Sequence, residues 1–579
     1  MFICGTAKRD LTVYEIGKGM MGYGMHFHVV KGVATPLYVR AFIFRTSTSR
    51  IAIAVGELCF YTIALKDAVV KKIQVLHPEW GYTDHTILLT GQHTHCGPGG
   101  YSHHLLFNIT IPGFRQRIFD HIVDETVAAI IAAESSATEA SVYYAEGIMP
   151  LENPVAFNRS LHAYNRNPEI TIKLKKEEWH LATDRCMRLL RIDTPDGRSM
   201  GSINWYGVHT TSMSNDNFFI HFDNKGYAAK YMEQDAVKNG NDEFISAFAQ
   251  ERCGDVSPNY VWDAQKKWTR GSCENDDDSA KENGRYQNEL AQLLFEKSVE
   301  NRALSPVIDA HLIFVNMAYQ EIEPAYTGGL PGQMTSPPSH GVSFLEGTKE
   351  GPGLPKAGGV MMRITTAAIR FYEHRLLSLF VSESRRAAIK RKYQAQKKKN
   401  IMIEAGEGRL AGTTNIKKLI VPGSIDPVIK TFKEIDRQGY TKKLPWVPEI
   451  VPLQIIILDT IAWVSFGAEI TVIAGKRLEK TVAEVLVKRG INKVILAPYS
   501  NGYHGYITTR EEYAAGAYEG GHTVYGEWTL AAYQMWFKKL AEEMLLPPSE
   551  RKLQEGIKAE IFSPDEIWRG EPHQRFQTS

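Results

Sequence analysis

Residues 51–90 read IAIAVGELCFYTIALKDAVVKKIQVLHPEWGYTDHTILLT, and this stretch decides the class of fold. Its first five residues, IAIAV, and its last five, TILLT, are short apolar runs typical of buried β-strands. Between them, residues 60–76 carry Ile63, Val69, Val70 and Ile73 at helical spacing. The order strand, helix, strand is the unit of a parallel or mixed sheet, so the stretch predicts an α/β fold.

The same alternation returns elsewhere in the chain. Residues 115–134 place their apolar side chains in one helical stripe with charges opposite, which predicts an amphipathic helix. Residues 451–466, VPLQIIILDTIAWVSF, predict two strands around a turn at Asp459, followed by a helix over 472–489 and a strand over 494–497. We therefore expect one large mixed-sheet α/β domain over residues 1–545, with a polar C-terminal tail over 546–579.

Composition narrows the class of protein. The 579 residues are 43% hydrophobic and 23% charged, as in globular proteins, and the net charge of +2 gives no reason to expect a nucleic-acid partner. The six cysteines lack CxxC spacing, which indicates reduced thiols instead of a cysteine zinc knuckle or a secreted disulfide framework. With no long apolar run and no signal-peptide pattern at Met1, we expect no transmembrane helix and a cytoplasmic protein.

Two segments have unusual composition. Residues 328–359 are rich in Gly, Pro and Ser, and a loop of that length inside a domain is more often functional than idle, so an ordered loop or lid is expected. Residues 384–400, SRRAAIKRKYQAQKKKN, are strongly basic. They fit either a solvated helix face or a peripheral contact with an anionic membrane surface.

The segment QHTHCGPGG, residues 92–100, directly follows the TILLT run. In an extended chain, residues two apart point the same way, so His93 and His95 are expected to share a face. The glycines and proline that follow permit a sharp turn beside that face. The pair suits a metal ligand and a second polar group, although a structural histidine pair explains the pattern equally well.

Other polar residues also follow apolar, β-prone runs. They are His209 in INWYGVHTTSM, Asp255 and Ser257 in GDVSPN, Glu469 in FGAEIT, and Tyr506 in YSNGYHGYITTREEY. GDVSPN is not the G-x-S-x-G elbow of α/β-hydrolases, which disfavours a serine triad on that fold. Each residue alone fits an ordinary structural role.

Eight short segments of the chain occur in the order and approximate spacing seen in the neutral ceramidases. The chain resembles that family from about residue 5 to about residue 545. They are GMMGYGM (19–25), GQHTHCGPGGY (91–101), FNRS (157–160), INWYGVHTTSM (203–213), DNKGYA (223–228), AFAQERCGDVSPN (247–259), GAEIT (467–471) and NGYHGYITTREEY (501–513).

The resemblance implies one zinc ion per chain, held by His93, His209, Glu469 and Tyr506. Two imidazoles and a carboxylate suit a borderline-soft cation and leave a position for water or substrate. The implied reaction is hydrolysis of the N-acyl amide bond of ceramide to a sphingoid base and a fatty acid. A lipid or another N-acyl compound is the expected substrate.

The resemblance also assigns catalytic roles. Ser257 corresponds to the serine described as the nucleophile of the family, and His95 and Arg159 to polar residues that face the substrate. His95 or Tyr506 suits proton delivery to the departing amine. Direct attack by Ser257 and orientation of a water molecule by Ser257 both remain open.

The sequence departs from the family in two places. Cys96 stands where the family has serine in HTHSGPGG, and we expect this nearly isosteric change to tune the site without abolishing it. The tail after residue 546 is too short for the family's C-terminal immunoglobulin-like domain, which is expected to be absent. An amidase or esterase for another acyl compound, and a non-catalytic lipid-binding homologue, are the competing functions.

Overall fold

The computed structural model describes residues 1–351, 353–419, 426–553 and 557–570. The predicted strand, helix and strand appear as β5 (Arg50–Gly56), α1 (Ile63–Leu76) and β6 (Ile87–Gly91). The two strands pair in parallel, with Ala52 opposite Ile87, and the Thr62 side chain caps the helix by accepting the Leu65 N–H. This prediction is confirmed.

These strands form one edge of an eight-stranded mixed sheet in the order β13-β11-β10-β8-β1-β4-β5-β6. Its parallel pairs are β5–β6 and β11–β13, and the other neighbours are antiparallel. The remaining strands are β1 (Phe2–Asp10), β4 (Tyr38–Arg45), β8 (Thr138–Ile148), β10 (Cys186–Asp193), β11 (Ser199–Trp205) and β13 (Ile245–Ala249).

A second sheet has four strands in the order β17-β23-β24-β26. Its strands are β17 (Ile308–Asn316), β23 (Ile450–Leu458), β24 (Ile461–Phe466) and β26 (Lys493–Ala497). Asp459, with φ of 51°, makes the predicted turn between β23 and β24. The predicted helix follows as α10 (Val472–Leu486).

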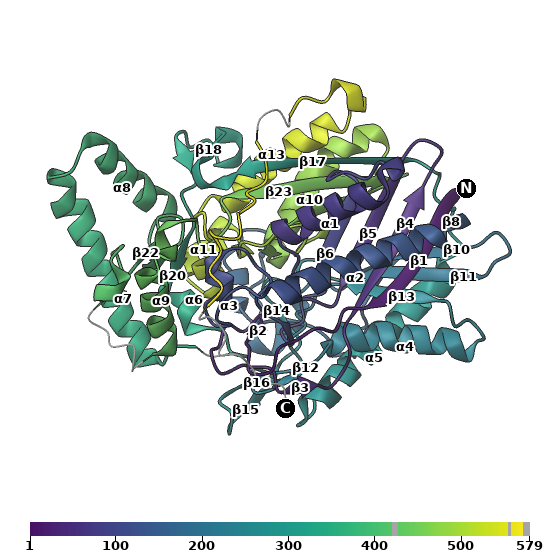
Figure 1. The fold of residues 1–579 in the computed structure, drawn as a ribbon, viewed down its shortest axis with the longest axis horizontal. Helices are drawn as coiled ribbons and strands as arrows, with labels where there is room; N and C mark the ends of the chain where they lie inside the picture. The colour runs from purple at the N-terminus through teal and green to yellow at the C-terminus, as the bar shows by residue number, and fades with distance from the viewer. Residues whose placement is uncertain (352, 420–425, 554–556, 571–579) are drawn as a thin grey trace.

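Both sheets are buried on both faces, so the core has four layers. On β4, Phe42 and Phe44 join the apolar cluster between the sheets, whereas Ala41 and Ile43 join the cluster under the outer helices. Across the inner layer the rings of Trp205 and Trp463 lie 5.4 Å apart. Helices on the large sheet are α1, α2 (Gln116–Ser135), α4 (Asp223–Lys238) and α5 (Asp276–Ser298), and those on the small sheet are α10 and α13 (Thr529–Glu543) (Figure 1).

The described residues between 320 and 446 build a lobe at the left of Figure 1. It contains β18 (Glu321–Ile322), β19 (Gln333–Met334), β20 (Ser339–Gly341), α6 (Val342–Glu346), α7 (Lys356–Phe371), α8 (Glu383–Gln396), β21 (Ile401–Glu404), β22 (Arg409–Leu410) and α9 (Pro427–Arg437). The described part of the expected loop over 328–359 thus contains two short strands, helix α6 and the first residues of α7. The basic segment over 384–400 lies mostly on α8.

The thiols, the helices and the C-terminal tail are each the subject of an expectation from sequence. All six cysteines are free thiols. Among the helices of the described residues, none has the length and apolarity needed to cross a membrane. In the tail, residues 557–570 follow the surface of the domain and bury Ile567 and Trp568, and the Trp568 carbonyl accepts the Phe114 N–H.

Candidate active site

Three short pairings bring distant segments together at one point. Strands β25 (Glu469–Ile470) and β27 (Tyr506–Ile507) pair in parallel and set Glu469 directly opposite Tyr506. Strands β9 (Phe157–Asn158) and β14 (Val256–Ser257) pair next to Arg159. A single bridge between Thr94 and Thr210 joins the histidine segments. Because side-chain direction follows the register of a strand pair, these pairings aim the polar groups at a common centre.

His93, His209 and Glu469 converge at that centre. Their ligand atoms lie within 4.8 Å of one another, and all three side chains are buried. Glu469 Oε2 lies 3.3 Å from His93 Nε2 and 3.0 Å from His209 Nε2. Three residues from positions 93, 209 and 469 therefore offer their donor atoms to one point.

Backbone carbonyls fix the tautomers of both imidazoles. His93 Nδ1 donates to the Cys59 carbonyl at 2.8 Å, and His209 Nδ1 donates to the Cys253 and Val256 carbonyls at 2.8 and 2.9 Å. Each Nε2 atom consequently faces the Glu469 carboxylate. Such carbonyl partners typically orient histidines that bind metals.

The charges at the centre suit a cation. Burial alone raises the pKa of Glu469, but His93 and His209 outweigh it and hold that pKa well below its usual range. Burial and the nearby Arg159 lower the pKa of His209. Two imidazole Nε2 atoms and one carboxylate form a donor set that fits a divalent metal ion of the zinc type.

His95 lies at the centre, but the backbone conformation that places it there differs from the predicted one. The expectation of an extended segment is wrong, because β6 ends at Gly91 and His93 has a φ of 78°, in the left-handed region. The two rings nevertheless meet, with Nε2 of His95 3.1 Å from Nε2 of His93. Burial and the neighbouring His93 and His209 lower the pKa of His95 well below its usual value.

Arg159 links Tyr506 to two buried carboxylates. Its guanidinium donates to the Tyr506 hydroxyl at 2.9 Å and to Glu350 Oε1 at 2.5 Å. Glu519 accepts a further bond from Arg159 Nε at 2.9 Å. Although burial disfavours its charge, the surrounding Tyr506, Glu350 and Glu519 raise the pKa of Arg159, so it stays cationic.

Ser257 donates its hydroxyl to Glu350 Oε2 at 2.5 Å and accepts the Asn259 N–H at 2.9 Å. The same carboxylate oxygen accepts from Thr211 at 3.0 Å and from Asn259 Nδ2 at 3.1 Å. Glu350 is only 3% exposed. Every site residue named from the sequence therefore lies in one connected network.

A family model for "Neutral/alkaline non-lysosomal ceramidase, N-terminal" matches residues 2–425 and 433–535. The chain belongs to the neutral ceramidase family. Neutral ceramidase A of Dictyostelium discoideum is 31% identical over 574 residues, which cover 93% of this chain and 72% of the relative. The neutral ceramidase of Pseudomonas aeruginosa is 29% identical over 554 residues, covering 93% and 71%.

Solved ceramidase structures share the fold. The structure titled "Ceramidase complexed with C2" superposes with a TM-score of 0.77 at 28% identity and covers 96% of this chain and 77% of that one. The crystal structure of the Pseudomonas aeruginosa neutral ceramidase gives a TM-score of 0.73 at 27% identity, with coverage of 98% and 76%. This member of the neutral ceramidase family is a hydrolytic enzyme, an amidohydrolase of the N-acylsphingosine type.

Sequence reasoning missed Glu350 and Glu519 in this ceramidase-family site. Glu350 lies in the segment TKEGPG of the expected loop, and Glu519 on α12 (Tyr518–His522). Nothing local distinguishes either residue from an ordinary surface glutamate. Only burial beside Arg159 reveals them.

The segment that leads to Ser257 is hydrogen-bonded to the segment that carries Glu469. The Gly254 N–H donates to the Ile470 carbonyl at 2.8 Å, and Asp255 Oδ1 accepts the Val472 N–H at 2.9 Å. A Cβ on Gly254 would lie 2.9 Å from the Glu469 carbonyl oxygen, so the approach requires glycine. Burial and Glu512 raise the pKa of Asp255 to about 8.

The cysteines near the centre are poorer ligand candidates. Cys59, His93 and His95 also group closely, but burial raises the pKa of the Cys59 thiol well above its usual value. Cys96, at the family's serine position, is buried, and its sulfur accepts from Asn217 Nδ2 at 3.2 Å.

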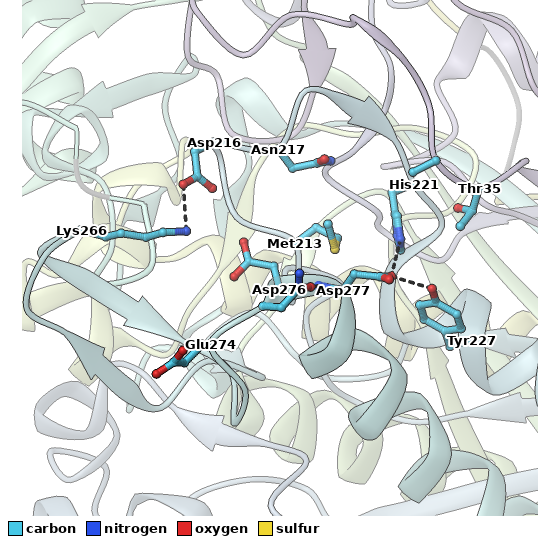
Figure 2. A pocket seen from close by; sticks show the side chains of 12 residues that line it. Thr35, Met213, Asp216, Asn217, His221, Tyr227, Lys266, Glu274, Asp276 and Asp277 are labelled. Carbon is cyan, nitrogen blue, oxygen red and sulfur yellow. Dashed lines mark hydrogen bonds and ion pairs between the residues drawn. The ribbon is translucent and has the colours of Figure 1, made fainter.

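A cavity of about 470 Å³ lies beside the site (Figure 2). Lys266 pairs with Asp216, and Asp277 accepts from both His221 and Tyr227. Met213 also lines this cavity, and its carbonyl accepts from Tyr23, whose ring packs edge-on against His95. The acidic lining contrasts with the imidazoles at the centre.

Proposed function

We propose that the chain hydrolyses the N-acyl amide bond of ceramide to a sphingoid base and a free fatty acid, with one zinc ion per chain. The observation that carries the proposal is the convergence of His93, His209 and Glu469 with both Nδ1 atoms held by carbonyls. Tyr506, which faces Glu469 across the β25–β27 pair, is the fourth ligand. Burial and Glu469 raise the pKa of Tyr506, so the phenol is neutral until a cation binds beside it.

Bound zinc would polarise the amide carbonyl as a Lewis acid. Ser257 Oγ attacks the carbonyl carbon and passes its proton to Glu350, which already accepts that hydrogen bond. Arg159 and His95 stabilise the oxyanion, where one donor is typically worth about 3–4 kcal/mol. The C–N bond then breaks as the amine takes a proton from His95 or Tyr506, and the proton that Glu350 received from Ser257 replaces it. Water then attacks the acyl carbonyl, and one of its protons restores the Ser257 hydroxyl as the fatty acid leaves.

The test combines metal analysis with release of fatty acid from an N-acylsphingosine. His93→Ala and Glu469→Ala should lose both metal and turnover, whereas Ser257→Ala should keep the metal and lose turnover. Full activity in the serine variant would remove Ser257 from the mechanism. Cleavage of another N-acyl amine but not of ceramide would reject the substrate and leave the chemistry intact.

Trapping separates the two roles of Ser257. With a slowly hydrolysed acyl substrate, direct attack predicts an acyl group on the Ser257 peptide by mass spectrometry. Turnover without any acylated peptide would favour the orientation of water by Ser257.

A further inference from the structure

Helix α7 exposes its apolar side to solvent and turns its polar side toward the protein, the reverse of what surface helices usually do. A π-helical segment (Tyr372–Leu376) and a 3-10 segment (Leu377–Leu379) continue it, so residues 356–379 form one helical rod. Large apolar side chains along one side of this rod and at its end face solvent. These residues are between 45% and 86% exposed: Val360, Met361, Ile364, Phe371, Tyr372, Leu376, Leu379 and Phe380. We call them the apolar face; a surface helix normally buries its apolar side.

The opposite stripe of the rod is polar and binds the protein. Arg363 pairs with Glu346, and Thr366 Oγ1 contacts Asn400 Oδ1 at 3.4 Å. Arg370 donates to the Lys397 carbonyl, and Glu373 is only 1% exposed. The rod cannot roll to bury its apolar face without breaking these contacts, so that face is held outward.

Basic side chains border the apolar face. Residues 384–400 contain eight Lys and Arg and no Asp or Glu. Lys392 is buried in ion pairs with Glu373 and Glu404, but Arg386 and Lys390 are exposed. Arg386 Nε donates to the Ser378 carbonyl at 2.7 Å, which places this charge next to Leu379. Apolar surface and positive charge are therefore contiguous.

We propose that the apolar face and its basic border bind the surface of an anionic lipid bilayer. A helix with an apolar side and a basic flank lies in the interface plane, where buried apolar area and attraction to anionic headgroups add. Contiguous exposed apolar surface of this kind marks an interaction site. Figure 1 shows α7 and α8 at the outer edge of the molecule, where a flat bilayer can reach them.

The surface is also near the reaction centre. Helix α6 precedes α7 and packs on α12, where the rings of Phe344 and His522 lie 4.4 Å apart. Glu519 of α12 holds Arg159, and Glu350 lies between α6 and α7 in sequence. Docking would thus set the site beside a bilayer; this consequence, unlike the binding itself, rests on the proposed function.

Vesicle flotation tests the binding on the full chain with Ser257→Ala, so that turnover does not interfere. The probes are phosphatidylcholine vesicles with and without phosphatidylserine. Val360→Ser/Ile364→Ser/Phe380→Ser should weaken binding by about a hundredfold or more. Arg386→Glu/Lys390→Glu should weaken binding to the anionic vesicles by at least about tenfold and leave binding to the neutral ones unchanged. Val75→Ser/Ile172→Ser, at two 80% exposed sites elsewhere, is the matched control.

Vesicle binding by the triple variant at the level of the parent would overturn the proposal. So would a parent chain that floats with neither vesicle, or that dimerises through this face in sedimentation while the triple variant is monomeric. In the active chain, the triple variant should lose turnover of bilayer-held ceramide but keep turnover of a soluble short-chain analogue. Absent turnover of both substrates with intact vesicle binding would instead count against the proposed function.

Discussion

The reaction centre and the apolar face of α7 break opposite rules of protein architecture. The centre buries charged side chains, such as Glu469, Arg159 and Glu350, where most proteins bury apolar ones. The rod over residues 356–379 exposes apolar side chains where most proteins expose charged ones. In the centre the buried charges are paired, whereas on α7 the exposed side chains have no counterpart within the described residues.

The two regions differ in whether the free-energy cost of their unusual side chains is offset within the chain. A buried charge costs several kcal/mol unless partners compensate it, so the ion pairs of Arg159 with Glu350 and Glu519 indicate selection for chemistry at that point. Exposed apolar surface costs little in an isolated chain and becomes favourable only when something covers it. The ion pairs of the centre are satisfied within the chain, whereas the apolar face gains free energy only when a partner covers it.

The largest effect is expected at Glu350. In Glu350→Gln, the amide replaces the carboxylate that accepts the Ser257 hydroxyl and pairs with Arg159. Turnover should fall by about 10²–10⁴-fold, the usual contribution of a positioned acid or base, while metal content stays at the parental level. Steady-state kinetics with metal analysis measures both.

Glu346→Gln is the control, because Glu346 lies in the same segment but pairs with Arg363 on the surface. Its turnover should match the parent. If Glu350→Gln were also as active as the parent, Glu350 would have no part in the reaction.

A second buried network of charged side chains stabilises the lobe that carries the apolar face. Removing its central carboxylate should have the next largest effect, on the stability of the lobe. Glu373 accepts from Lys392 at 2.6 Å and from Tyr393 at 2.8 Å, and it also pairs with Arg409. Glu373→Ala leaves two buried cations without this partner and should destabilise the lobe by about 3–5 kcal/mol. Urea unfolding of the variant measures this loss of stability. An unchanged unfolding midpoint would contradict the stabilising role of Glu373.

The same carboxylate predicts how acid affects the lobe. Burial alone raises the pKa of Glu373, but Lys392 and Arg409 outweigh it and lower that pKa to about 2. A carboxylate whose folded pKa is depressed stabilises the protein above its unfolded pKa of about 4.3, and this contribution is lost as pH falls toward 2. The stability gap between the parent and Glu373→Ala should therefore narrow below about pH 4. A gap that widens on acidification would contradict this sign.

The fold could be predicted from sequence further than the site could. The β5–α1–β6 unit and the β23–β24 hairpin are confirmed because their periodicities are local and each strand faces a core on both sides. The four proposed ligands were named through the family resemblance. Nothing local reveals that a two-residue pairing sets Glu469 opposite Tyr506.

Glu350 and the orientation of α7 lay beyond sequence reasoning for the same physical reason. Periodicity indicates that a helix has two sides, but not which side the rest of the chain covers. The inward side of α7 is decided by Glu346 and by residues 397–400, which approach it only in the folded chain.

The smallest effect is expected on the apolar face itself. Ile364 is 67% exposed, so Ile364→Ser should change the free energy of unfolding by no more than about 0.5 kcal/mol. Ile403, on β21 of the same lobe, is 3% exposed, and Ile403→Ala should cost about 2–5 kcal/mol through lost burial and a cavity. Urea unfolding without lipid compares the two variants directly. A cost at Ile364 as large as that at Ile403 would mean that the chain already covers this face in solution, and the contrast between the two regions would disappear.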